Sequence, residues 1–308
     1  MDDTCPNIQL TDTVAIPCVG FGTYLIPDIE ASALVNTAFG VGYRHVDTAE
    51  GYENESGVGE GIAVSMSEHE LSREDVFVTT KLWPGNPEWG DPAKTKETTI
   101  ASLLESLQRL QIDYVDLYLI HAPFCREQRL NQWRGLVELQ QLGKARAVGV
   151  SNYSQAHIEE IRSAGLPIPC VNQIELHPWS QKPELVAYLD DNGITSIAYS
   201  SLVPLSTWRS KQGQESAKTS QMRAEGEAGR SPFSAMAEKY GVSEAQVLLR
   251  WAVQQKHPVL PKSNSRGRMQ QNLDLFSFVI DDEDMRAIEK MDRGKSVAWP
   301  MGDPTESP

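Results

Sequence analysis

The feature that most constrains the fold is a repeat of short runs of apolar or β-branched residues, which predict strands and recur about every thirty residues. Each run is followed by a segment whose apolar residues have the spacing of a helix. Eight such pairs can be counted along the chain. The predicted strands are 19–23, 44–48, 76–82, 115–121, 145–151, 171–176, 194–199 and 259–263. Eight βα units can close into a barrel or form an open doubly wound sheet, and periodicity does not choose between these two folds.

Two predicted helices carry clear signals. Residues 95–110 place apolar side chains on one face. In residues 242–255, Ser243 can cap the helix ahead of Gln246. Both helices are expected to pack outside a parallel sheet. A hairpin is predicted over 8–16, where it can plug one mouth of a barrel.

Composition limits the possible functions. The chain has 308 residues, enough for one barrel or two smaller domains. Its formal net charge of -14 disfavours binding to nucleic acid, which usually requires a basic face. The four cysteines lie far apart without a CxxC pair, so neither a zinc cluster nor a disulfide framework is indicated. Because no apolar run approaches a membrane span and the N-terminus lacks the signals of a secretory leader, we expect a cytosolic protein with no membrane contact.

Two stretches interrupt the repeat. Residues 206–231 form a polar loop, which is either a cover over the active face or an inert insertion. Residues 294–308 form a loop-like tail with Trp299 in its only apolar cluster, and most tails of this kind fray.

Polar residues stand at the carboxyl ends of the predicted strands. In a closed barrel these ends converge on one rim, where barrel enzymes build their active sites, whereas an open sheet would scatter them. Their placement therefore favours the barrel. The residues concerned are Asp47, Lys81, His121, Ser151, Asn152, Gln173, Tyr199, Lys262 and Ser263.

At these positions the chain resembles a known family. Residues 42–49 (GYRHVDTA), followed by Tyr52 and 54–55, resemble the first signature of the aldo-keto reductases. The resemblance extends from residue 8 to about 293. It implies one (β/α)8 TIM barrel domain over 1–308 that reduces an aldehyde or ketone with NADPH. Further matching segments, in order, are 117–121 with Pro123, 149–152, 172–173 with 177–178, and 261–263 with Arg268 and Asn272.

The resemblance implies a catalytic tetrad of Asp47, Tyr52, Lys81 and His121. Tyr52 would give a proton to the developing alkoxide, provided that its pKa is lowered from about 10 toward working pH. Lys81 would supply the positive charge that lowers it, Asp47 would hold Lys81, and His121 would donate a hydrogen bond to the substrate oxygen. Each residue alone has an ordinary structural interpretation, and Asp47 in particular can be a salt-bridged structural residue.

The resemblance also implies a cofactor site. Ser151, Asn152 and Gln173 would hold the carboxamide, and Tyr199 would stack on the nicotinamide. Lys262, Ser263 and Arg268 match a pocket for the 2'-phosphate, which favours NADPH (NADP+) over NADH because two cations can bind a dianion. A basic surface loop is the alternative. The predicted cofactor set is completed by Thr23, Asp47, Ser200, Leu202 near the pyrophosphate, and Asn272 at the adenine.

Three residues depart from the family pattern. Ser201 and Val203 replace the usual Pro and Gly, and Gln271 stands where Glu is common, so the local loop conformation and part of adenine recognition can differ.

Two other patterns in the sequence do not indicate a binding site. The glycines between Gly57 and Gly61 lack the spacing of a dinucleotide fingerprint. Glu175 with His177, and His157 with Glu160, are isolated pairs without a third ligand, so no metal is predicted.

The substrate pocket is the least constrained part of the prediction. The resemblance places Tyr24, Trp83, His121 and Ala122 there, and Ala122 replaces a bulky aromatic of some relatives. Trp179, Phe124 and Trp299 are either additional walls or residues of the core or surface. Such a rim suits aldehydes, ketones, open-chain sugars and keto acids. A monomer is expected, and a non-catalytic barrel that senses a cofactor or binds a protein is the alternative function.

Overall fold

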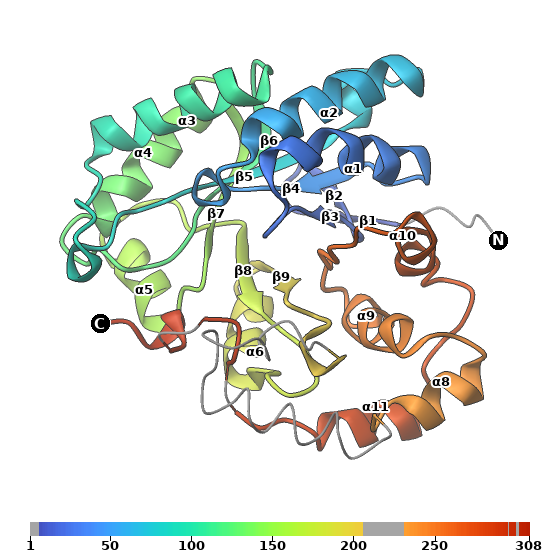
Figure 1. The fold of residues 1–308 in the computed structure, drawn as a ribbon. Helices are drawn as coiled ribbons and strands as arrows, with labels where there is room; N and C mark the ends of the chain where they lie inside the picture. The colour runs from blue at the N-terminus through green and yellow to red at the C-terminus, as the bar shows by residue number, and fades with distance from the viewer. Residues whose placement is uncertain (1–5, 206–230, 295, 300–301) are drawn as a thin grey trace.

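The computed structural model describes residues 6–205, 231–294, 296–299 and 302–308 (Figure 1). Its central sheet consists of strands that run parallel and pair in chain order, which is the order expected when each βα unit lies beside the next. The strands of this sheet are β3 (Phe21–Gly22), β4 (His45–Asp47), β5 (Phe77–Leu82), β6 (Val115–Ile120), β7 (Ala145–Ser151), β8 (Val171–Glu175) and β9 (Thr195–Tyr199).

The eighth predicted strand, 259–263, closes the barrel, but fewer of its residues pair with the neighbouring strands than expected. Val259 forms parallel bridges to Val19 on one side and to Ala198 on the other. The Gly20 amide donates to the Val259 carbonyl at 2.8 Å, and the Val259 amide donates to the Cys18 carbonyl at 2.9 Å. Prolines at 258 and 261 lie on either side of this residue, and since proline has no N–H, neither can donate a ladder hydrogen bond. Their carbonyls still accept from the Ala198 and Gly22 amides, at 2.8 and 3.3 Å.

Helices surround the curled sheet (Figure 1). The two helices with clear sequence signals are confirmed: Thr95 caps α3, and Ser243 caps α9 in a capping box with Gln246. The helices are α1 (Asp28–Gly40), α2 (Glu55–Glu68), α3 (Lys96–Leu110), α4 (Arg129–Gln141), α5 (Gln155–Ser163), α6 (Pro183–Asp191), α8 (Ser234–Tyr240), α9 (Glu244–Gln254), α10 (Arg266–Leu273) and α11 (Asp282–Glu289).

The predicted hairpin is also confirmed, as the antiparallel pair β1 (Asn7–Gln9) and β2 (Ala15–Pro17). Its apolar residues Leu10, Val14 and Ile16 belong to one buried cluster with side chains from the beginnings of the strands, including Phe77 and Val171. The hairpin therefore fills the end of the barrel at which the strands begin. The opposite end, where the strands finish, is the one at which a site can be built.

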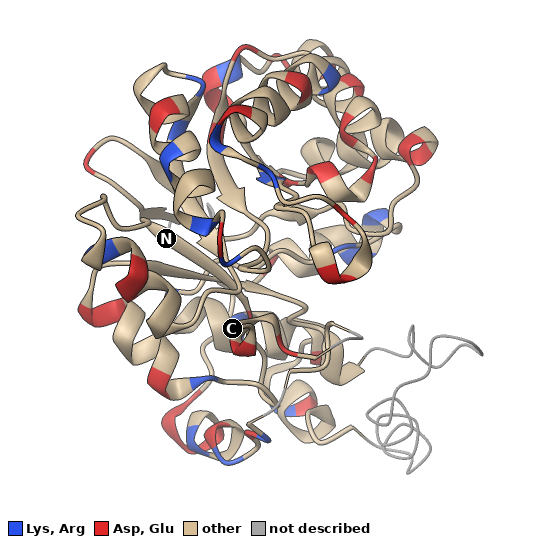
Figure 2. Ribbon diagram, turned by 90° about the vertical axis from the view of Figure 1, so that its left-hand side faces the viewer, with Lys and Arg blue, Asp and Glu red and all other residues tan. Residues whose placement is uncertain are grey.

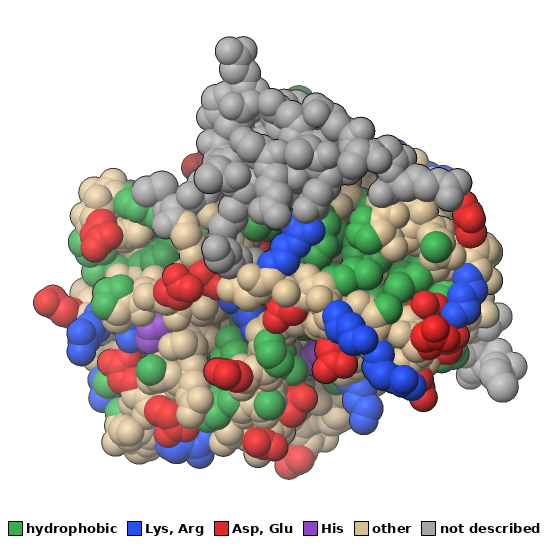
Figure 3. All heavy atoms as spheres, turned by 90° about the horizontal axis from the view of Figure 1, so that it is seen from below, with side chains coloured by type: hydrophobic (Ala, Val, Ile, Leu, Met, Phe, Trp, Pro, Cys, Tyr) green, Lys and Arg blue, Asp and Glu red, His purple; other side chains and the backbone are tan. Residues whose placement is uncertain are grey.

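The charged side chains on the outside of the barrel are mixed in sign. Acidic and basic residues lie close together over the helices shown in Figure 2 and over the face shown in Figure 3. Within the part of the chain that the structure describes, no helix has the length and hydrophobicity needed to span a bilayer.

The packing of α2 against the end of α3 gives a prediction about stability. A Cβ added at Gly59 would lie 2.6 Å from the Leu110 Cα, among backbone atoms that cannot move aside. We expect Gly59→Ala to lower the free energy of unfolding by about 1–3 kcal/mol despite the better helix propensity of alanine. Urea denaturation measures this change.

The matched control is Gly267→Ala in α10, where the nearest atom to an added Cβ is 4.0 Å away. This substitution should leave stability unchanged or raise it by up to about 1 kcal/mol. Equal stability of Gly59→Ala and the wild type would contradict the described helix packing.

Candidate active site

The predicted rim residues are brought together at the end of the barrel opposite the hairpin. Asp47 ends β4, Lys81 lies one residue before the end of β5, and His121 directly follows β6. Ser151 and Tyr199 end β7 and β9. Since the strands are parallel, these side chains reach one another, as their hydrogen bonds show.

A buried ion pair lies at the centre of this rim. The Lys81 Nζ donates to the Asp47 Oδ1 at 2.5 Å and to the Thr48 carbonyl at 2.8 Å. The Lys81 side chain is fully buried, which lowers the pKa of its ammonium, whereas the Asp47 carboxylate raises it. The pair thus keeps a lysine inside the protein with two oxygen partners.

Tyr52 lies beside this pair. The short 3-10 turn Glu50–Tyr52 carries it, and its hydroxyl is 3.4 Å from the Lys81 Nζ. Burial and the charge of Asp47 raise the pKa of Tyr52 well above its usual value. The expected lowering of this pKa was therefore wrong, because Asp47 offsets the charge of Lys81 and the protein desolvates the phenolate. A phenol that keeps its proton at neutral pH remains a proton donor.

His121 faces Tyr52 across the rim. The two ring centroids are 5.4 Å apart in an edge-on arrangement. Burial and the nearby Lys81 lower the pKa of His121 well below its usual value, so its imidazole is neutral. A neutral imidazole has one N–H to donate and one nitrogen to accept. Among the described residues, nothing hydrogen-bonds to its Nδ1.

The residues predicted for a carboxamide lie next to Asp47. The Gln173 Nε2 donates to the Asp47 Oδ2 at 2.9 Å, and the Ser151 hydroxyl donates to the Gln173 carbonyl at 2.8 Å. The Asn152 Oδ1 accepts from the Tyr199 hydroxyl at 2.7 Å. An amide oxygen has two lone pairs, so Asn152 can accept a second hydrogen bond from a ligand amide. This set can therefore hold a carboxamide.

Three further residues were predicted for the cofactor site: Thr23, Ser200 and Leu202. The Thr23 hydroxyl donates to the Asp47 carbonyl at 3.0 Å. Ser200 has a positive φ of 56°, and a short turn over Val203–Leu205 follows it. Leu202 is half-buried in this loop. The predicted cover over 206–231 falls almost entirely outside the described residues.

The predicted phosphate pocket lies at the start of α10. Lys262 and Arg268 are exposed, and the described part of the chain pairs neither of them with a carboxylate. The Lys262 Nζ donates only to the neutral Asn264 amide in its described contacts, at 3.2 Å. The Ser263 hydroxyl donates to the Ser265 carbonyl at 3.3 Å, and Asn272 is buried. Two cations without anionic partners, in a chain of charge -14, fit a phosphate.

Aromatic rings border His121. The rings of Trp83 and Trp299 each lie 5.9 Å from it, and Phe124 lies 5.5 Å from Trp299. On the other side of the rim, the half-exposed Tyr24 packs against Tyr52 at 5.1 Å. Ala122, by contrast, is fully buried.

Two residues of this region escaped the sequence analysis. Trp89 stacks on Trp83 with the centroids 6.0 Å apart, and Glu50 accepts from the Trp83 amide at 2.9 Å while pairing with Lys94. The only sequence signal for Glu50 was its position two residues before Tyr52.

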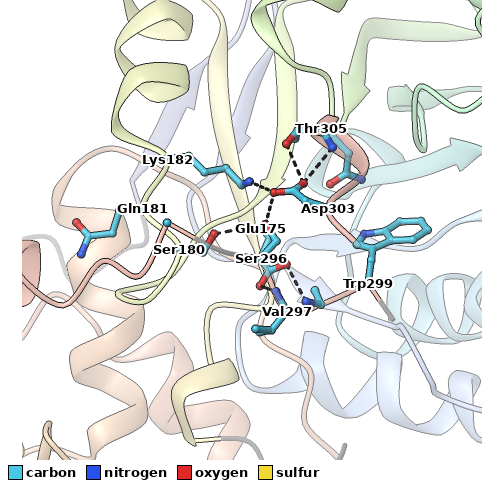
Figure 4. A network of polar contacts seen from close by, with 12 residues as sticks. Glu175, Ser180, Gln181, Lys182, Ser296, Val297, Trp299, Asp303 and Thr305 are labelled. Atoms are coloured by element: carbon cyan, nitrogen blue, oxygen red, sulfur yellow. Dashed lines mark hydrogen bonds and ion pairs between the residues drawn. The ribbon is translucent and has the colours of Figure 1, made fainter. Parts of the chain in front are cut away.

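The expectation that the tail frays was wrong for its described residues. The Glu175 carboxylate accepts from the Val297 and Ala298 amides at 2.7 and 2.8 Å (Figure 4). His177 bonds to the same carboxylate, and His157 bonds to the Ser307 carbonyl. These contacts give His177 and His157, one from each of the two His–Glu pairs, a role in packing. The described residues contain no cluster of three or more metal-ligating side chains.

Comparison with known proteins agrees with the sequence resemblance. The model of the Aldo/keto reductase family matches residues 19–293. An NAD(P)H-dependent D-xylose reductase of Candida tropicalis is 35% identical, and the alignment covers 94% of both chains. A glyoxal reductase of Bacillus subtilis is 37% identical, again over 94% of both. The crystal structure of a Bombyx mori aldo-keto reductase in complex with NADP superposes with a TM-score of 0.85 at 33% identity, covering 99% of this chain and 98% of the other.

The buried ion pair gives a second prediction about stability. Lys81→Met leaves the Asp47 carboxylate, only 3% exposed, without its cation, and should lower the free energy of unfolding by about 3–5 kcal/mol. The double variant Asp47→Asn with Lys81→Met removes both charges, so its loss should be smaller than the sum of the two single losses. Urea denaturation at pH 7 tests this, and simple additivity would show that the pair is not coupled.

Proposed function

Because the chain belongs to the aldo/keto reductase family, we propose that it reduces aldehydes and ketones with NADPH in preference to NADH, using Tyr52 as the proton donor. At the coarser level, it is an NAD(P)H-dependent oxidoreductase that reduces carbonyl compounds. The observation that carries the proposal is the buried Asp47–Lys81 pair, whose ammonium lies 3.4 Å from the Tyr52 hydroxyl.

Each member of the tetrad has a distinct role in the proposal. When bound, NADPH supplies the hydride that reduces the carbonyl carbon. Tyr52 gives its proton to the carbonyl oxygen, because an alkoxide is a stronger base than a phenolate. Lys81 stabilises the phenolate that remains, and Asp47 holds Lys81 in place. The neutral His121 donates a hydrogen bond to the same substrate oxygen.

The raised pKa of Tyr52 is compatible with this role. The phenol is fully protonated at neutral pH and loses its proton only when negative charge develops on the substrate. Reduction therefore does not require Tyr52 to be deprotonated before the substrate binds. In the reverse reaction the same residue would act as the base, because the two directions share one transition state.

The cofactor assignments rest on two groups of residues, one beside Asp47 and the other near the start of α10. Ser151, Asn152 and Gln173 offer amide and hydroxyl groups to a carboxamide next to Asp47, with Tyr199 beside them. Thr23, Ser200 and Leu202 are also proposed to contact the cofactor. Lys262, Ser263 and Arg268 are proposed to bind the 2'-phosphate, and Asn272 the adenine. Among the described residues no carboxylate pairs with Lys262 or Arg268, and this supports NADPH over NADH, since only the former carries that phosphate.

The substrate assignment remains broad. Aromatic rings at Tyr24, Trp83 and Trp299 border His121, and flat apolar walls accept aldehydes, ketones and the open chains of sugars. We propose that the chain is a single barrel domain acting as a monomer, because the proposed site needs no residue from a second copy.

Substitution of Tyr52 tests the reductase against a non-catalytic, cofactor-sensing barrel. Tyr52→Phe should lower kcat at least about a hundredfold, because it removes the general acid, while NADPH binding is retained. NADPH absorbance with a panel of aldehydes, ketones and aldoses measures the turnover. The control is Tyr188→Phe, which removes a hydroxyl bonded to Glu159 on the outer helices. Turnover that survives in Tyr52→Phe would refute the proposed acid.

Substitution of the cations tests the preference for NADPH. Lys262→Ala and Arg268→Ala should each raise the dissociation constant of NADPH about tenfold to a hundredfold, because each removes a charge-assisted hydrogen bond, with little change for NADH. Titration calorimetry with both cofactors measures this, and Lys290→Ala, an exposed lysine at the end of α11, controls for net charge. Equal losses for the two cofactors would remove the 2'-phosphate assignment.

A further inference from the structure

The C-terminal tail is fixed on the rim by a buried carboxylate. Glu175, at the end of β8, is 1% exposed and accepts from the amides of Val297 and Ala298. His177 bonds to its Oε1 at 2.8 Å, and these contacts lower the pKa of Glu175. A buried carboxylate with three donors is a strong anchor, because each hydrogen bond to a charged acceptor is stronger than a neutral one.

A second anchor holds the chain on the far side of Trp299. Asp303 pairs with Lys182 at the start of α6 and accepts from the Ser296 hydroxyl at 2.6 Å and from the Thr305 hydroxyl at 2.8 Å (Figure 4). Beyond this point Arg129 binds the Pro308 carbonyl at 2.6 Å. Trp299 therefore lies between two fixed points.

The indole of Trp299 reaches a proposed cofactor residue. Its Nε1 donates to the Tyr199 hydroxyl at 2.9 Å, and this hydroxyl donates to the Asn152 Oδ1 at 2.7 Å. The Tyr199 hydroxyl thus has one donor and one acceptor partner. Packing against Phe124 and His121 fixes the plane of the indole itself.

The same hydrogen bonds continue to the proposed catalytic groups. The Asn152 Nδ2 donates to the Ser151 hydroxyl at 3.0 Å, and Ser151 in turn donates to the Gln173 carbonyl. The Gln173 side chain then reaches Asp47, the partner of Lys81. Hydrogen bonds therefore connect the tail to the Gln173 backbone carbonyl, and the side chain of the same residue contacts the ion pair at the centre of the rim.

We propose that Trp299 is a positioning residue for the nicotinamide ring: its indole N–H, together with Asn152, fixes the Tyr199 ring against which the nicotinamide stacks. This inference rests on the proposed function, which assigns Tyr199 to that ring. A tyrosine held at its hydroxyl by two partners needs little ordering when a ligand binds, and preorganisation of this kind increases affinity. The tail thereby acts on cofactor binding through Tyr199.

The test compares Trp299→Phe, Tyr199→Phe and the double variant in the full chain. Trp299→Phe keeps an aromatic side chain at this position but removes the N–H donor and part of the ring, and the Trp89→Phe control makes the same loss of ring area. It should raise the dissociation constant of NADPH about threefold to tenfold, the effect of losing one neutral hydrogen bond. Because the two single variants break the same bond, the double variant should bind NADPH no more weakly than Tyr199→Phe alone. Titration calorimetry measures all four proteins.

Two controls separate positioning from a general structural effect. 2',5'-ADP carries the phosphate and adenine parts of NADPH but no nicotinamide, so its affinity should not change in Trp299→Phe. Trp89→Phe makes the same substitution in a tryptophan whose described ring contacts are with Trp83 and Phe124. The NADPH affinity of this variant should stay at the wild-type value.

The outcomes distinguish this inference from the proposed function. If Trp299→Phe raises only the KM for the carbonyl substrate, Trp299 is merely a wall of the substrate pocket, and the inference is wrong while the proposed function stands. If 2',5'-ADP and NADPH weaken equally, or if the two single losses add, positioning through Tyr199 is also wrong. A wild-type protein that binds neither NADPH nor NADH would overturn the proposed function and this inference together.

Discussion

The buried pairing of Lys81 with Asp47 is the interaction on which the rest of the site depends. An unpaired ammonium inside a protein is unfavourable by several kcal/mol, so a fully buried lysine requires a carboxylate in contact with it. Here β4 and β5 are adjacent parallel strands, and Asp47 and Lys81 stand near their carboxyl ends. The barrel topology thus places the two charges together, and the Thr48 carbonyl and the Gln173 side chain add one further hydrogen bond to Lys81 and to Asp47, respectively.

The same pairing explains why sequence reasoning gave the wrong direction for the pKa of Tyr52. The motif indicated a tyrosine near a lysine, and a lone cation would lower the pKa of a phenol. In the structure the lysine is neutralised by Asp47, so the desolvation of the phenolate decides the direction. Residue types reveal which charges are present, but the balance between charge and burial depends on three-dimensional distances that a sequence does not contain.

Much of the fold could be predicted because its signals are local. Strand periodicity, the Ser243 cap and the polar residues at strand ends each lie within a few residues of the feature they specify. The docking of the tail has no such signal: Glu175 accepts from backbone amides more than a hundred residues later in the chain, and any residue type except proline can supply an amide. The eighth strand is likewise reduced to bridges at Val259, because the two nearby prolines cannot donate backbone hydrogen bonds. The pattern of apolar residues alone does not indicate this shortening.

The polar groups around Asn152 form hydrogen bonds with one another before any ligand binds. Asn152 donates to the His121 carbonyl and to Ser151, and its oxygen accepts from Tyr199. A ligand amide therefore meets oriented groups with lone pairs to spare, instead of side chains that must first be ordered or desolvated. Since the unsatisfied burial of a polar group costs about 1–3 kcal/mol, such mutual satisfaction stabilises the folded protein and the geometry of recognition together. In the proposed cofactor site, the same hydrogen bonds therefore serve both folding and ligand recognition.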